Sequence, residues 1–140
     1  MVQSRRAKSG LDAGAEALAA YVADSSNWER VLPAAIGALG ALLMVALFWP
    51  NPPFLATLLV ALSLIMLWRA RPVDWGAYGV CAIMGTLAEI AGVGTGGWEY
   101  VQTTAWGVPV WLPFLWGIAY LAMVQVGREF ARLGAHMKVG

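Results

Sequence analysis

The sequence predicts an all-α, polytopic membrane protein with four transmembrane helices, an N-terminal amphipathic helix and both termini in the cytoplasm. Of its 140 residues, 60% are hydrophobic and only 12% are charged, whereas about 25% are charged in a typical soluble domain. Two long segments, residues 31–68 and 100–127, contain no charged residue. A membrane-spanning helix needs roughly 20 mostly apolar residues, so each segment is too long for the core helix of a soluble protein.

The N-terminal part contains a predicted short helix and the start of the first span. Residues 11–23 carry apolar side chains at helical spacing, which predicts an amphipathic helix. Residues 26–29 match a capping box, in which Ser and Glu side chains bond backbone N–H groups at a helix start. The helix that begins there is expected to continue as the first span, and Pro33 either kinks it or marks where its buried part begins.

Prolines and one acidic residue mark the boundaries of the other spans. Prolines at positions 50, 52 and 53 cannot continue a helix, and they separate the first span from the second. Pro72 and Asp74 open the third span, where a helix N-terminus favours negative charge. Pro109 opens the fourth. The predicted spans are residues 31–49, 54–68, 73–93 and 109–127, with a loop at 93–108 between the last two.

The basic residues predict the orientation. In the four-span arrangement all nine fall on one side of the membrane: Arg5, Arg6, Lys8, Arg30, Arg69, Arg71, Arg128, Arg132 and Lys138. Basic residues favour the cytoplasmic side, so we expect both termini there and the loop 93–108 outside. The predicted organisation is an N-terminal segment (1–30), a membrane domain (31–130) and a cytoplasmic tail (131–140), in a multi-pass protein of a bacterial inner membrane.

Glu89 is the only carboxylate well inside a predicted span, and it is the candidate catalytic residue. A carboxylate at mid-membrane costs about 2.5–3.5 kcal/mol on insertion scales. The residues on its helix face are small, so that face is expected to turn toward other helices. Two interpretations stay open: Glu89 handles a proton or a ligand, or it only fastens its helix to the neighbouring loop.

Aromatic residues surround this position in the sequence. A glycine-rich stretch, residues 92–97, can end the helix and let the chain fold back. The candidate ligand-binding residues follow it: Trp98, Glu99, Tyr100, Trp106, Trp111, Trp116 and Tyr120. Such an aromatic wall suits a flat apolar ligand, but it equally suits a lipid-facing belt at headgroup depth or a partner helix.

The sequence lacks the residues that several classes of functional site require. No His, Cys, Asp and Glu set has metal-ligand spacing, and the only histidine, His136, lies in the tail. There is no Ser, His and Asp constellation. We therefore expect no metal, no cofactor and no nucleic-acid partner.

The arrangement Glu89-x-x-Gly92-x-x-Thr95-Gly96-x-x-x-Tyr100, followed by Gly107-Val108-Pro109 and a Trp-rich helix, resembles the membrane-embedded carotenoid-biosynthesis hydratase family. The resemblance covers residues 85–117. It implies that Glu89 protonates an isoprenoid double bond, that water adds to the cation, and that Tyr100 and the tryptophans shield that cation. Family members are larger, so the resemblance implies half of such a protein or a dimer.

Together these observations favour a small accessory or structural subunit of a larger membrane assembly. Its expected partners are membrane lipid and either other membrane subunits or a second copy of the chain. The alternative is an isoprenoid-binding or lipid-binding membrane enzyme that uses Glu89 as proton donor. A third interpretation is a component of a small-molecule transporter.

Overall fold

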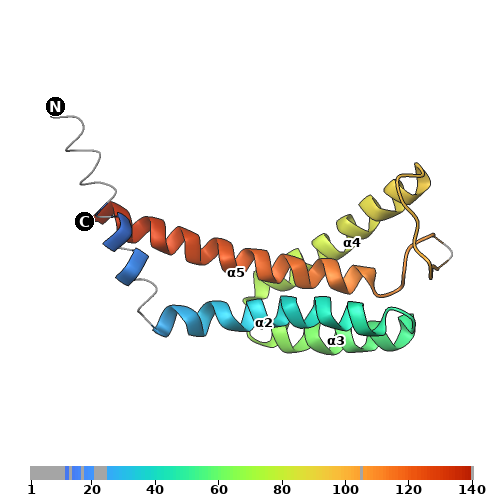
Figure 1. The fold of residues 1–140 in the computed structure, drawn as a ribbon, viewed down its shortest axis with the longest axis horizontal. Helices are drawn as coiled ribbons and strands as arrows, with labels where there is room; N and C mark the ends of the chain where they lie inside the picture. Colours follow the sequence, from blue (N-terminus) through green and yellow to red (C-terminus); the bar gives the residue numbers. More distant parts are fainter. Residues whose placement is uncertain (1–11, 13, 17, 21–24, 105, 140) are drawn as a thin grey trace. The chain divides into compact units, whose positions relative to one another are not determined.

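The described part of the chain is all-helical. A computed structural model describes residues 12, 14–16, 18–20, 25–104 and 106–139, and no strand occurs among them. The long helices are α2 (Ser25–Phe48), α3 (Pro52–Trp68), α4 (Pro72–Gly94) and α5 (Leu112–Val139) (Figure 1). This confirms the all-α fold class. The amphipathic helix predicted at residues 11–23 lies largely outside the described residues, although those described there are helical.

Two helices begin at prolines of the predicted turns. Proline lacks a backbone N–H, and the first helical N–H groups have no partner within the helix, so proline is tolerated there. α3 accordingly begins at Pro52, and the Asn51 side chain accepts a hydrogen bond from the N–H of Phe54 at 3.3 Å. α4 begins at Pro72, and the carboxylate of Asp74 accepts the N–H of Arg71 at 3.2 Å.

The first and last long helices extend beyond the predicted spans. Pro33 lies within α2, which begins at Ser25, next to the helix start predicted at residues 26–29. α5 continues to Val139, well past the predicted end of the fourth span at residue 127 and through most of the predicted tail. Arg132 and Glu129, three residues apart on α5, form an ion pair. Such pairs on one helix face favour continued helix.

The chain divides into two compact units. One contains residues 34–123, and the other combines residues 1–33 with 124–140. The larger unit holds most of α2, all of α3 and α4, the α4–α5 loop (residues 95–111) and the first part of α5. Its core joins α2, α3, the loop and α5 through these buried residues: Ala41, Leu55, Ala56, Leu59, Val108, Trp111, Leu112 and Ile118.

In the larger unit, aromatic rings of one helix pack directly against glycines of the neighbouring helix. The ring of Tyr78 on α4 lies so close to Gly117 of α5 that a Cβ there would collide with it. The indole of Trp116 on α5 lies against Gly85 of α4 in the same way. Because glycine has no side chain, each ring reaches the partner backbone, which is the close packing expected where lipid supplies no hydrophobic drive between helices.

Tyr78 also makes a polar contact to α3. Its hydroxyl donates to Ser63 Oγ at 2.8 Å, and Ser63 Oγ donates to the carbonyl of Leu59 at 2.7 Å. Ser63 is buried, with 4% of its surface exposed. One side chain of α4 therefore contacts both α3 and α5.

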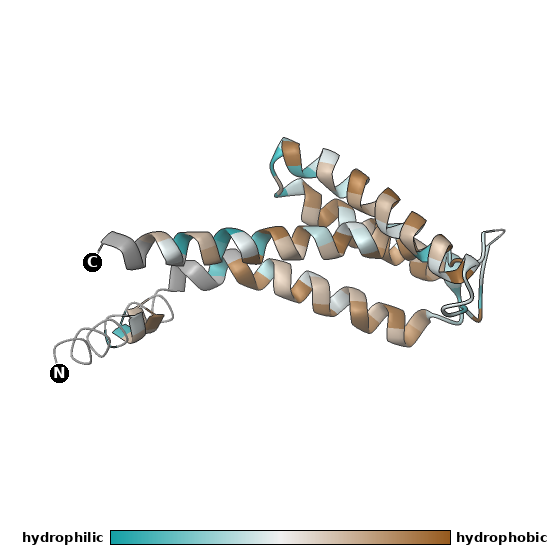
Figure 2. Cartoon of the chain, turned by 90° about the horizontal axis from the view of Figure 1, so that it is seen from above, coloured by the Kyte–Doolittle hydropathy of each residue, from teal (hydrophilic) through white to brown (hydrophobic). Residues whose placement is uncertain are grey.

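Apolar side chains also cover the outer surfaces of these helices. Figure 2 shows hydrophobic residues along α2, α3 and α4. Exposed examples are Ile36, Leu39, Leu43, Leu47, Leu64, Ile65, Val80, Ile83 and Met84. Two helical segments, Val31–Phe48 and Pro72–Gly94, are long and apolar enough to cross a membrane by length and composition, and Pro52–Trp68 is a shorter apolar helix.

We expect Gly117→Ala to lower the free energy of unfolding by about 1–3 kcal/mol, the usual cost of overpacking, because its Cβ meets the ring of Tyr78. Gly79→Ala is the matched control, since a Cβ there meets nothing within 4 Å. The check is denaturant unfolding of both variants in detergent, with circular dichroism as the measured signal. Equal stabilities for the two variants would contradict the ring-on-glycine contact.

Candidate functional site

The end of α4 reverses the chain. Gly97 N–H donates to the carbonyl of Gly92, and Gly96 N–H donates to that of Val93, both at 3.0 Å. Gly96 has a φ of 75°. This pair of bonds is a Schellman motif, which satisfies the last carbonyls of a helix and needs a left-handed residue. The glycine-rich stretch therefore ends the helix, as the sequence predicted, and directs the loop back along α4.

The reversal brings two aromatic donors to one carboxylate. Glu89 Oε2 accepts a hydrogen bond from the indole Nε1–H of Trp98 at 3.0 Å and another from the hydroxyl of Tyr100 at 2.8 Å. The six-membered ring of Trp98 lies against Gly92, where a Cβ would collide with it. Because Gly92 has no side chain, it leaves room for the indole, whose Nε1–H reaches Glu89.

The environment of Tyr100 keeps its hydroxyl protonated. Burial, followed by the hydrogen bond to Glu89 and the negative charge of that carboxylate, raises the pKa of Tyr100 to about 12. The phenol is thus a hydrogen-bond donor at every physiological pH. Glu89 is half-buried. Both donors use its Oε2, and among the described residues no other group bonds the carboxylate.

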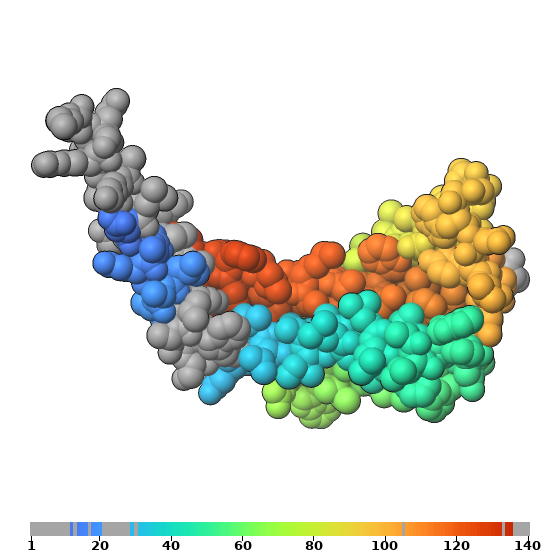
Figure 3. Space-filling model, viewed as in Figure 1, coloured from blue at the N-terminus to red at the C-terminus, as the bar shows by residue number. Residues whose placement is uncertain are grey.

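The rest of the loop is fastened to the turn between α2 and α3. The Gln102 side chain donates to the carbonyl of Pro50 at 3.0 Å, although 52 residues separate them. The hydroxyl and N–H of Thr104 donate to the carbonyl of Val108 at 2.8 and 2.9 Å. Figure 3 shows the loop, in yellow and orange, beside this turn at one end of the larger unit. Both connections therefore lie at the same end of the helices.

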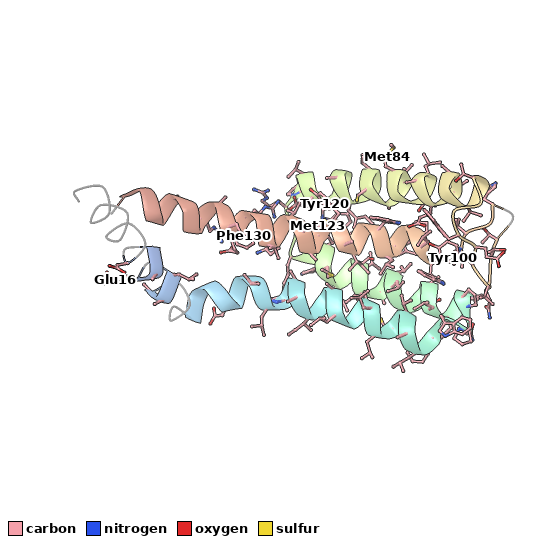
Figure 4. All side chains as sticks on the ribbon, turned by 45° about the horizontal axis from the view of Figure 1, so that its top comes forward. Glu16, Met84, Tyr100, Tyr120, Met123 and Phe130 are labelled. Atoms are coloured by element: carbon pink, nitrogen blue, oxygen red, sulfur yellow. The ribbon has the colours of Figure 1, made fainter. Side chains whose placement is uncertain are left out.

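The structure assembles only part of the predicted site. Glu89, Trp98 and Tyr100 come together, whereas Glu99 and Trp106 are exposed and make no hydrogen bond to Glu89. The other three aromatic residues lie elsewhere: Trp111 in the core, Trp116 against Gly85, and Tyr120 farther along α5 and well apart from Tyr100 (Figure 4). The predicted residues therefore do not line one continuous wall.

The sequence did not predict three features of the structure. They are the Tyr78–Ser63 hydrogen bond, the Gln102–Pro50 hydrogen bond and the burial of Asp74, which is 2% exposed. The available signals were a tyrosine and a serine inside apolar spans, and an amide in the polar run of the loop. None of these signals identifies its partner.

The chemistry that this arrangement supports is limited and specific. Among the described residues, no group of His, Cys, Asp and Glu side chains could hold a metal ion. One carboxylate accepts two aromatic donors from a loop that begins six residues later in the chain. This geometry holds the loop against α4, because releasing the loop would break both hydrogen bonds, one of them between the half-buried side chains of Glu89 and Tyr100.

No protein-family model, curated protein or solved structure matches this chain. Any proposal for its function therefore rests on the geometry of the site.

We expect the titration of Tyr100 to report its burial and its bond to Glu89. Its raised pKa means that the folded protein holds this proton more tightly than the unfolded chain, in which tyrosine ionises near pH 10. The stability it contributes is fully present below pH 10 and is lost as pH rises through about 12. Tyrosinate absorbance of wild type minus Tyr100→Phe should therefore rise near pH 12. A difference curve centred at pH 10, like that of the denatured protein, would contradict the contact.

Proposed function

We propose that this chain is a multi-pass membrane protein with four transmembrane helices and cytoplasmic termini, and that it serves as an accessory or structural subunit of a larger membrane assembly. The observation that carries the proposal is the double hydrogen bond on Glu89 Oε2, because it makes this carboxylate, near the end of α4, an internal acceptor. A catalytic acid would instead direct its own proton toward a substrate.

Helix lengths support the four-span arrangement. α4 has 23 residues, and α3 has 17, which lies at the lower end of the roughly 17–25 residues that cross a bilayer. The fourth span is the apolar part of α5 before Arg128. In this arrangement the α2–α3 turn and the α4–α5 loop must lie on the same face, and the Gln102–Pro50 bond joins them.

The distribution of apolar surface supports a role in an assembly. Large apolar side chains on α2 and α4 are exposed in the isolated chain, including Leu39, Leu43, Val80 and Ile83. Lipid or a partner helix must cover such a surface. The α4–α5 loop, held by hydrogen bonds to α4 and to the α2–α3 turn, gives the outer end of this surface a defined shape.

The isoprenoid-hydratase alternative uses the same residue in another role. There Glu89 would donate a proton, and Trp98 and Tyr100 would face the substrate cation instead of donating to the carboxylate. The two roles predict different behaviour of Glu89 variants, and native mass spectrometry of those variants separates the roles. A transporter component would need further buried ionisable groups along a path through the helices.

The proposed orientation predicts from which side of the membrane a maleimide reaches each single cysteine. With Cys81 replaced by serine, Thr103→Cys in the α4–α5 loop should react with a membrane-impermeant maleimide on intact bacterial spheroplasts. Ala70→Cys in the turn between α3 and α4 should react only after lysis, because that turn faces the cytoplasm. Labelling of Ala70→Cys before lysis would contradict the four-span topology.

Variants of Glu89 should alter stability and leave bound partners in place. Glu89→Leu removes the acceptor of two hydrogen bonds, and we expect it to lower the free energy of unfolding by about 2 kcal/mol, since each typical hydrogen bond contributes about 0.5–1.5 kcal/mol. Glu89→Gln keeps one carbonyl acceptor and should lose less. Glu99→Gln, at an exposed carboxylate, is the control and should lose nothing.

The same variants test the proposed role through native mass spectrometry after gentle purification. We expect wild type and Glu89→Gln to retain the same protein partners and no isoprenoid. If Glu89→Gln folds normally but loses a bound isoprenoid or a hydratase turnover that wild type shows, Glu89 is a catalytic acid and the structural role is wrong.

A further inference from the structure

The turn between α3 and α4 presents two arginines between two exposed tryptophans. Trp68, the last residue of α3, is 88% exposed, and Trp75 in the first turn of α4 is 49% exposed. Arg69 is exposed, and the side chain of Arg71 is 64% exposed. This surface, Trp68 to Trp75, lies at the opposite end of α4 from the Glu89 site.

The two arginines differ in their charge partners. Arg71 Nε lies 3.6 Å from Asp74 Oδ2, and Asp74 is buried beneath it with 2% exposure. Arg69 has no ion-pair partner among the described residues. Two arginines and one aspartate leave a net charge of +1 at this turn. At the other end of α4, Glu89 and Glu99 give a charge of −2, so the turn is the basic end of this unit.

The neighbouring tryptophans set the depth of Arg69. Exposed indoles at the ends of apolar helices favour the boundary between hydrocarbon and headgroups. Arg69 follows Trp68 directly, so its guanidinium can reach the phosphate layer while its aliphatic stem stays beside the apolar helix end. In the proposed membrane arrangement, both indoles and the guanidinium of Arg69 lie at the level of the lipid headgroups.

We propose that Arg69, flanked by Trp68 and Trp75, binds the phosphate of an anionic phospholipid in the cytoplasmic leaflet. The inference rests on the proposed membrane location and adds a specific lipid class to it. A guanidinium offers paired N–H donors that match phosphate oxygens. A zwitterionic phospholipid carries its own ammonium beside the phosphate, whereas phosphatidylglycerol keeps a net negative charge that Arg69 can balance.

The test measures which lipids stay bound. Wild type is placed in nanodiscs of phosphatidylcholine with a minor fraction of phosphatidylglycerol, and retained lipids are counted by native mass spectrometry. One basic residue near an anionic surface enriches anionic lipid about fivefold. We expect this enrichment in wild type, its loss in Arg69→Gln, and its partial retention in Arg69→Lys, which keeps the charge but not the paired donors.

Thr103→Glu is the matched control. It lowers the net charge of the chain by one, as Arg69→Gln does, but at the exposed α4–α5 loop. We expect it to keep the enrichment, and circular dichroism should show the same helix content in all four proteins. The site is wrong if Arg69→Gln retains phosphatidylglycerol as wild type does, or if Thr103→Glu loses as much.

The result also separates this site from the proposed membrane location. A chain that enters nanodiscs with no enrichment at Arg69 overturns only the lipid site. A chain that stays soluble and does not enter nanodiscs overturns the four-span proposal and the lipid site together.

Discussion

The double hydrogen bond on Glu89 Oε2 is the interaction on which the loop end of the larger unit depends. A carboxylate near the end of an apolar helix is costly unless donors compensate it. Trp98 and Tyr100 supply two donors, and their positions are possible only because the glycines at 92, 96 and 97 reverse the chain and leave room for the indole. The acid, the glycines and the aromatic residues are therefore one structural unit, and a change in one alters the others.

A second constraint is the satisfaction of the loop backbone. Irregular backbone at the end of a helical bundle must find its own hydrogen bonds. The Schellman bonds, the Thr104–Val108 turn and the Gln102–Pro50 bond meet part of this need. The loop then inserts Val108 and Trp111 into the core between α2, α3 and α5. It is thus packed structure, which explains why Trp111 is buried and does not lie at a lipid-facing surface.

The sequence predicted helix positions well because prolines and charges mark them locally. All four long helices begin or end within a few residues of a predicted span boundary, and the glycine-rich stretch ends α4 as expected. The sequence could not predict partners. Tyr78 bonds Ser63 and covers Gly117, and Gln102 reaches Pro50 across 52 residues. Such contacts depend on how helices pack, and periodicity reports only which face of each helix is apolar.

The structure brings three of the candidate residues together, Glu89, Trp98 and Tyr100, but their role depends on hydrogen-bond direction, which residue types do not specify. Glu89 beside Trp98 and Tyr100 suits both a proton donor facing an isoprenoid and an acceptor within the protein. In the structure both aromatic groups donate to one oxygen, and the raised pKa of Tyr100 keeps its hydroxyl a donor. Both bonds fasten residues of the loop to α4 through Oε2, whereas no described group hydrogen-bonds Oε1. The arrangement favours a role in holding the loop, which leaves the exposed apolar surfaces of α2 and α4 as the larger candidates for the protein's activity.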